Sequence, residues 1–86
     1  MPEISRFLGI VITMYFNDHN PPHFHVRYED FRAIVGIDRL ELREGELPPR
    51  VVGFVMEWAE LHQAELRENW TTLATGGKFN RIAPLI

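Results

Sequence analysis

The segment from residue 4 to residue 16 is dominated by β-branched and aromatic side chains, which are typical of a β-strand. We predict a strand from about Gly9 to Phe16 within it. The alternation of apolar and polar positions is weak there, because side chains on both sides of the strand are mostly apolar. A strand of this kind is usually covered on both faces, so it is predicted to lie near the centre of a sheet.

A polar loop is predicted at residues 17–22, where Asn and Asp favour turns and two prolines exclude a helix. From His23 to Glu29 apolar and polar side chains alternate, which predicts a strand with one face of each kind. The apolar positions are Phe24, Val26 and Tyr28, and the polar positions are His23, His25, Arg27 and Glu29. Two further strands are predicted at residues 31–37 and 39–43, and short consecutive strands tend to pair antiparallel.

The hydrophobic period changes to about 3.6 residues after Pro48 and Pro49, which suit the first turn of a helix. One helix is predicted from about residue 49 to residue 74, and a pair of glycines ends it. Trp58 and Trp70 lie on its apolar stripe and are predicted to pack against the apolar side of the sheet. The predicted fold is therefore α+β: an antiparallel three- to four-stranded sheet with one long helix packed on one face.

The chain of 86 residues fits one domain, residues 1–86, and its 45% of hydrophobic residues is enough for a core. It has no cysteine, which excludes disulfides and thiolate zinc sites and fits a reducing cytoplasm. No stretch approaches the ~20 apolar residues that span a bilayer, and the first residues lack the pattern of a signal peptide. We therefore expect a cytoplasmic protein with no membrane partner.

The net charge of −3 does not favour nucleic acid as a partner, because nucleic-acid-binding proteins usually have a basic surface. A local basic face remains compatible with this charge. Arginine and acidic residues nearly balance in the predicted sheet region, which is typical of a mixed, solvated surface.

Three histidines, His19, His23 and His25, lie within seven residues of one another. The side chains of His23 and His25 leave the same side of a strand with Cα atoms about 6.5–7 Å apart, so they can converge on one ion. Asp18 and His19 precede them in the loop and can complete a site. One interpretation of the pattern is a site for a divalent metal such as zinc, with Asp18, His19, His23 and His25 as its ligands.

Two other interpretations of this segment remain open. Imidazoles titrate near neutral pH, and Arg27 shares the side of His23 and His25, so His19, His23, His25 and Arg27 form a candidate catalytic or anion-binding set without metal. Alternatively, the polar side chains of the loop satisfy backbone groups and have a structural role alone. His62, on the apolar stripe of the helix, is predicted to be a buried histidine with a hydrogen-bond partner of its own, apart from this set.

Five segments of the chain resemble the bacterial family called domain of unknown function 4160. They are Pro2-Glu3-Ile4-Ser5-Arg6-Phe7, Met14-Tyr15-Phe16-Asn17-Asp18-His19-Asn20-Pro21-Pro22-His23-Phe24-His25, Gly45-Glu46-Leu47-Pro48, Glu57-Trp58-Ala59-Glu60-Leu61-His62 and Glu65-Leu66-Arg67-Glu68-Asn69-Trp70. The resemblance covers nearly the whole chain, and residues 17–25 are its most distinctive part. Members of the family often lie beside a second small gene, in pairs suspected to be toxin–antitoxin modules. The resemblance thus implies a small partner protein encoded nearby, but no established catalytic residues.

The resemblance favours an interaction protein, one half of a small bacterial two-protein module of toxin–antitoxin type. The alternative is a small hydrolase or nuclease that works through His19, His23, His25 and Arg27, with or without a metal. A regulatory nucleic-acid-binding module is a third interpretation, which the acidic net charge weakens.

Overall fold

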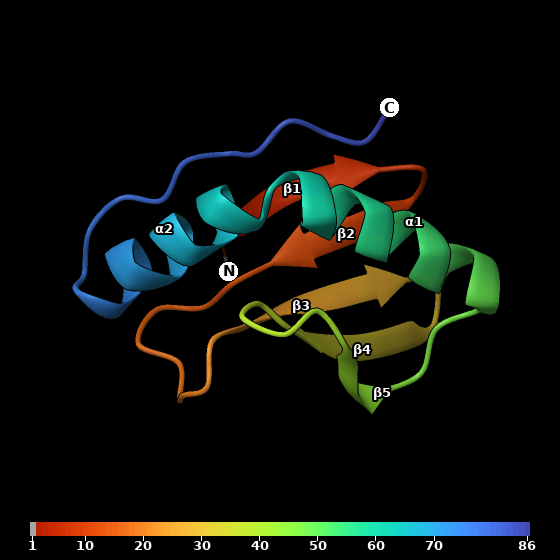
Figure 1. Ribbon diagram of the computed structural model, residues 1–86, viewed down its shortest axis with the longest axis horizontal. Coiled ribbons are helices and arrows are strands. Elements are labelled where there is room, and N and C mark those ends of the chain that lie inside the picture. The colour runs from red at the N-terminus through yellow and green to blue at the C-terminus, as the bar shows by residue number, and fades with distance from the viewer. Residues whose placement is uncertain (1) are drawn as a thin grey trace.

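A five-stranded antiparallel sheet and two helices make up the computed structural model, which describes residues 2–86 (Figure 1). The elements are β1 (Glu3–Phe7), β2 (Ile10–Thr13), β3 (His23–Tyr28), β4 (Phe31–Gly36), β5 (Leu42–Gly45), α1 (Pro49–Leu61) and α2 (Gln63–Ala74). The strands are ordered in the sheet as they are in the chain, and each neighbouring pair is antiparallel. The predicted α+β class and antiparallel pairing are confirmed.

The number of strands differs from the predicted three or four because the first apolar run folds into a hairpin. Leu8 and Gly9 connect β1 to β2 with φ angles of 52° and 77°. A two-residue turn with positive φ at both positions matches the twist of a hairpin. Leucine seldom adopts positive φ, so the sequence carries no turn signal at Leu8. The predicted strand from Gly9 to Phe16 is accordingly wrong at its end, since β2 ends at Thr13.

The single long helix that we predicted is also wrong, because His62 separates α1 from α2. His62 has φ −121° and ψ 23°, outside the helical region. Its N–H still donates to the carbonyl of Trp58, and the N–H of Leu66 donates to the carbonyl of His62. The two helices therefore follow one another in a single layer (Figure 1). Neither glycine nor proline stands at this break, so the apolar stripe gives no sign of it.

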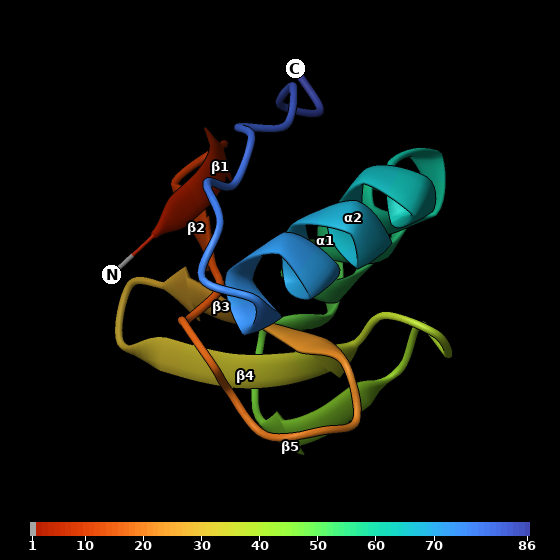
Figure 2. The same ribbon diagram turned by 90° about the vertical axis from the view of Figure 1, so that its left-hand side faces the viewer.

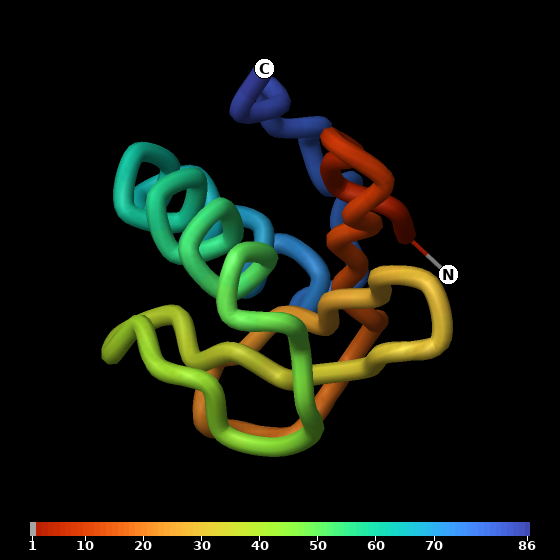
Figure 3. The backbone as a smooth tube through the Cα atoms, turned by 90° about the vertical axis from the view of Figure 1, so that its right-hand side faces the viewer, coloured from red at the N-terminus to blue at the C-terminus, as the bar shows by residue number. Residues whose placement is uncertain are grey.

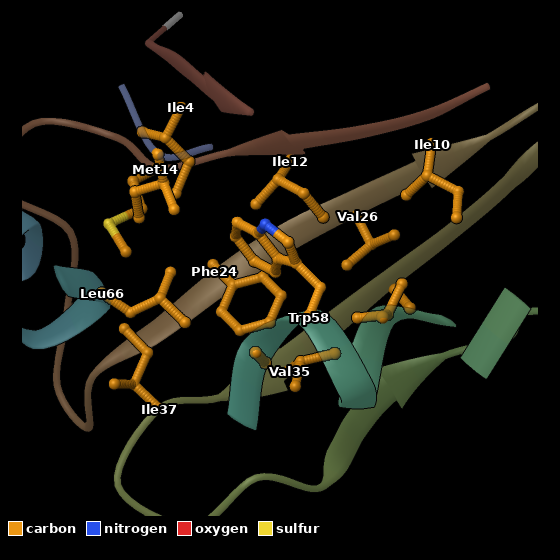
Figure 4. Close-up of a cluster of buried hydrophobic side chains, with 14 of the residues drawn as sticks. Ile4, Ile10, Ile12, Met14, Phe24, Val26, Val35, Ile37, Trp58 and Leu66 are labelled. Carbon is orange, nitrogen blue, oxygen red and sulfur yellow. The ribbon is translucent and has the colours of Figure 1, made fainter. Parts of the chain in front are cut away.

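Both helices cover the same face of the sheet, and the hydrophobic core lies between these layers (Figure 2). Trp58 of α1 is fully buried and packs on Phe24, with the two ring centres 5.9 Å apart (Figure 4). The ring of Phe7 lies 5.4 Å from that of Trp58. This confirms the burial predicted for Trp58. Trp70 of α2 differs from its prediction, because it is half-buried and its ring lies 5.1 Å from the ring of His23.

The last residues of the chain run beside β1 (Figure 1). Ile82 is buried, its N–H donates to the carbonyl of Ile4, and its own carbonyl accepts the hydroxyl of Ser5. The indole N–H of Trp58 donates to the carbonyl of Ala83 at 2.8 Å. The tail therefore protects the outer edge of β1 and fastens it to α1.

Within residues 2–86, neither a helix nor the tail lies over the other face of the sheet (Figures 2 and 3). The chain crosses to the helix layer after β5, where Leu47 is buried, and it does not return to this face (Figure 3). This surface of β2 to β5 is called the open face below. None of the helices in residues 2–86 has the combination of length and apolar character that a membrane span needs.

Candidate functional site

The loop at residues 17–22 is held at both ends and folds back over the start of β3. Asn17 has φ 52°, a conformation that asparagine adopts more readily than most residues, and its N–H donates to the carbonyl of Leu73 at the end of α2. At the other end, the carbonyl of Pro22 accepts the N–H of Ile37 at 3.1 Å. These contacts bring Asp18 next to the first residues of β3.

The carboxylate of Asp18 lies at the centre of the three clustered histidines. Its Oδ2 atom is 2.9 Å from Nε2 of His23 and 3.3 Å from Nε2 of His25. Its Oδ1 atom accepts the backbone N–H of His19 and lies 3.0 Å from Nδ1 of the same residue. Burial acts to raise the pKa of Asp18, but the hydrogen bonds from His19 and His25 and the charge and hydrogen bond of His23 together lower that pKa below its usual value. Asp18 is therefore ionised at neutral pH.

Both ring nitrogens of His23 face hydrogen-bond acceptors. Nδ1 is 2.9 Å from the carbonyl oxygen of Pro21, which can only accept, so Nδ1 carries a hydrogen. Nε2 faces the ionised carboxylate of Asp18, which also can only accept. A neutral imidazole has one N–H, and the ring is 4% exposed, so water does not resolve the conflict. The position between His23 and Asp18 therefore calls for a second proton or for a metal cation.

His25 lies beside His23 on the same side of β3, as the two-residue spacing predicted. The two rings are 5.2 Å apart, and the ring of Tyr15 meets that of His25 edge-on at 4.5 Å. The ligand atoms that Asp18, His23 and His25 offer all lie within 4.8 Å of one another. Ligand atoms around a tetrahedral zinc ion are roughly 3.3 Å apart, given bonds of about 2.0–2.1 Å. The three residues, called the Asp18 cluster below, therefore bring three potential ligand atoms close enough together to converge on one divalent ion.

The remaining predicted site residues take different positions. The side chain of His19 is 84% exposed, and its ring nitrogens are outside the group of ligand atoms in the Asp18 cluster. Arg27 is exposed on the same side of β3 as His25, and within residues 2–86 its side chain has no hydrogen bond or ion pair. His62 forms a hydrogen bond of 2.6 Å between its Nδ1 atom and Oε1 of Glu65, apart from the Asp18 cluster, as predicted. The His62 side chain is half-buried, whereas we predicted that it would be buried.

Two aromatic residues contact the Asp18 cluster that the sequence analysis did not assign to it. Trp70 packs on His23 from α2, and Tyr15 packs on His25 from the segment after β2. Trp70 covers part of His23 and so contributes to its burial. Tyr15 and His25 both line a hollow on the open face. The only sequence signal for these contacts is the presence of aromatic residues, since each contact depends on how the loop returns to the sheet.

The fold and the site together define a small α+β protein that carries an Asp-His-His cluster at one end of a meandering sheet. A family model described as "Domain of unknown function (DUF4160)" matches residues 9–71. The chain belongs to this family, as its motifs indicated. No curated protein and no solved structure matches the chain.

Proposed function

We propose that this protein binds a divalent transition-metal ion, such as zinc, through Asp18, His23 and His25. The observation that carries the proposal is the arrangement of His23, whose two ring nitrogens both face acceptors. A metal ion between Nε2 of His23 and Oδ2 of Asp18 removes the conflict between two lone pairs. The N–H of His23 that donates to Pro21 then has the role usual for a ligating histidine, because such a bond fixes the tautomer and orients the ring.

Three protein ligands leave a coordination position open, as is typical of catalytic rather than structural zinc sites. A bound ion would supply Lewis-acid activation of water or of a substrate oxygen there. Solvent reaches the cluster along His25, which is 27% exposed and lines a hollow of the open face. These features favour a metal-assisted hydrolase over acid–base catalysis by histidines alone, and His19 and Arg27 are then groups near the substrate rather than ligands.

Zinc should raise the melting temperature of the chelator-treated protein, because an ion that binds only the folded state stabilises it. At a zinc concentration of about 100 times Kd the gain is about 2.7 kcal/mol. Asp18→Asn and His25→Ala should each abolish most of this gain, whereas His62→Ala and His19→Ala should retain it. Isothermal calorimetry and thermal unfolding, each with and without zinc, measure the effect.

His62→Ala is the matched control because His62 is also a half-buried histidine bonded to a carboxylate. A gain that is equal in Asp18→Asn and in the unchanged protein would contradict the proposal. The proposal would also be contradicted if zinc did not change the melting temperature of the unchanged protein and His23→Ala only lowered the stability. In that case His23 holds the loop through its contacts with Asp18 and Pro21, the loop is structural, and the enzyme function is withdrawn.

We also propose, from the family, that the protein acts in the bacterial cytoplasm with a small protein encoded beside it, as one half of a toxin–antitoxin-type pair. Two features of the structure favour a protein partner. Among residues 2–86 no helix covers the open face, and Phe16, which directly follows Tyr15 of the hollow in the sequence, is 59% exposed. Aromatic residues are enriched at protein–protein interfaces, so an exposed Phe16 favours a partner.

Co-expression with the protein encoded by the adjacent gene should give a complex that elutes as one species in gel filtration. Phe16→Ser should weaken this complex, because an aromatic residue that anchors an interface often contributes 2 kcal/mol or more to binding, roughly thirtyfold in Kd. Leu61→Ser is the control, since Leu61 is 68% exposed at the end of α1 in the other layer. Separate elution of the two proteins, or dissociation by Leu61→Ser alone, would contradict the proposal.

A further inference from the structure

The open face places two arginines directly opposite one another. In the pairing of the strands, Arg27 of β3 is opposite Arg32 of β4, and both side chains are exposed. Like charges in this position destabilise a sheet unless something of opposite charge lies between them. The Arg27 side chain has no hydrogen bond or ion pair within residues 2–86. Arg32 donates to the backbone carbonyls of Glu29 and Phe31, which carry no formal charge.

A hollow of about 440 Å³ lies over this pair of arginines. Its volume is within the range of pockets that hold small organic molecules. Val11 and Ile34 give it an apolar surface, and His25 and Tyr15 line it together with the arginines. Glu44 of β5 is the one carboxylate among its lining residues, opposite Ile34 rather than beside Arg27, and it forms no ion pair with either arginine within residues 2–86.

The hollow therefore joins the arginine pair to the Asp18 cluster. Arg27 and His25 are two residues apart on the same side of β3, with Cα atoms about 6.5–7 Å apart. His25 belongs to both places, because one edge of its ring faces Asp18 and the residue also lines the hollow. An anion held by the arginines consequently lies next to His25 of the Asp18 cluster. Two apolar side chains adjoin it, Val11 opposite Arg27 and Ile34 opposite His25.

We infer that the hollow binds an organic phosphate, with the phosphate group between Arg27 and Arg32 and the organic part over Val11 and Ile34. Guanidinium groups bind phosphate through paired hydrogen bonds, and the arginine pair supplies two of them. The inference rests on the proposed function only where it takes the bound phosphate ester to be the substrate of the metal site. Binding of the phosphate itself depends on the arginines and not on the metal.

Titration of the chelator-treated protein with adenosine monophosphate, followed by NMR, tests the inference. Backbone amide signals of residues 27 and 32–34 should shift and saturate, and adenosine without phosphate should bind at least tenfold more weakly. Arg27→Gln should weaken binding of the monophosphate roughly tenfold, the loss expected for one charged hydrogen-bond pair. Arg39→Gln, an exposed arginine outside the hollow, should leave the affinity unchanged.

A single-stranded oligonucleotide, used in parallel, distinguishes a free nucleotide from nucleic acid as the source of the phosphate, and Arg27→Gln should weaken either ligand. Equal binding of adenosine and its monophosphate would overturn the inference, as would equal losses in Arg27→Gln and Arg39→Gln. Asp18→Asn separates the two proposals. The Asp18→Asn protein should lose zinc binding and still bind the monophosphate. If the unchanged protein does not bind zinc, the proposed metal site fails, while the binding of phosphate by the arginines is tested independently.

Discussion

Replacing Trp58 by alanine should destabilise the protein by about 3–5 kcal/mol, the cost of removing a large buried aromatic side chain. Trp58 has no exposed surface, packs on Phe24 and Phe7 and donates its indole N–H to Ala83. The total stability of a chain of this size is on the order of 5–10 kcal/mol. The melting temperature should therefore fall by roughly 15–30 °C, which circular dichroism measures directly.

Two further variants separate the contributions of Trp58. Trp58→Phe keeps most of the packing and loses the hydrogen bond to the tail, so it should cost about 1–3 kcal/mol. Trp70→Ala is the matched control, because Trp70 is half-buried and its loss should cost less than that of Trp58. A Trp58→Ala protein that melts within a few degrees of the unchanged protein would show that the packing of α1 on the sheet does not depend on Trp58.

The fold was predictable from the sequence where one periodicity dominates. The alternation in β3 correctly placed Phe24 and Val26 in the core, since a strand with one apolar face has a single favourable orientation. Prediction failed at the Leu8–Gly9 turn, where Gly9 was assigned to the start of a strand, and at His62, where neither glycine nor proline marks the end of α1.

Part of the candidate site followed from local geometry. Period-two spacing places His23 and His25 on one side of β3, and the observed rings are neighbours. The position of Asp18 between them depends on the loop contacts with Leu73 and Ile37, which come from distant parts of the chain. The same limit applies to Arg32, because its position opposite Arg27 is a consequence of strand register, which spacing along one strand does not reveal.

Substitution of Gly45 by alanine should also be strongly destabilising, by about 2–5 kcal/mol. Gly45 has φ 85°, where an L-residue costs about 1–2 kcal/mol, and its new Cβ would overlap the carbonyl oxygen of Arg32 and lie 2.8 Å from Cα of Ala33. These are backbone atoms, so β5 must move away from β4. Because Glu44 and Gly45 line the hollow, the ligand-binding surface should be disturbed together with the stability.

Gly53→Ala provides the control, because Gly53 lies in α1 with no atom near its potential Cβ. Alanine is the better helix former there and should stabilise the protein by roughly 0.5–1 kcal/mol. The two glycine variants should thus change the midpoint of urea unfolding in opposite directions. A Gly45→Ala midpoint equal to that of the unchanged protein would show that β5 does not pack closely on β4. The hollow, which needs that packing for one of its walls, would then lose its structural basis.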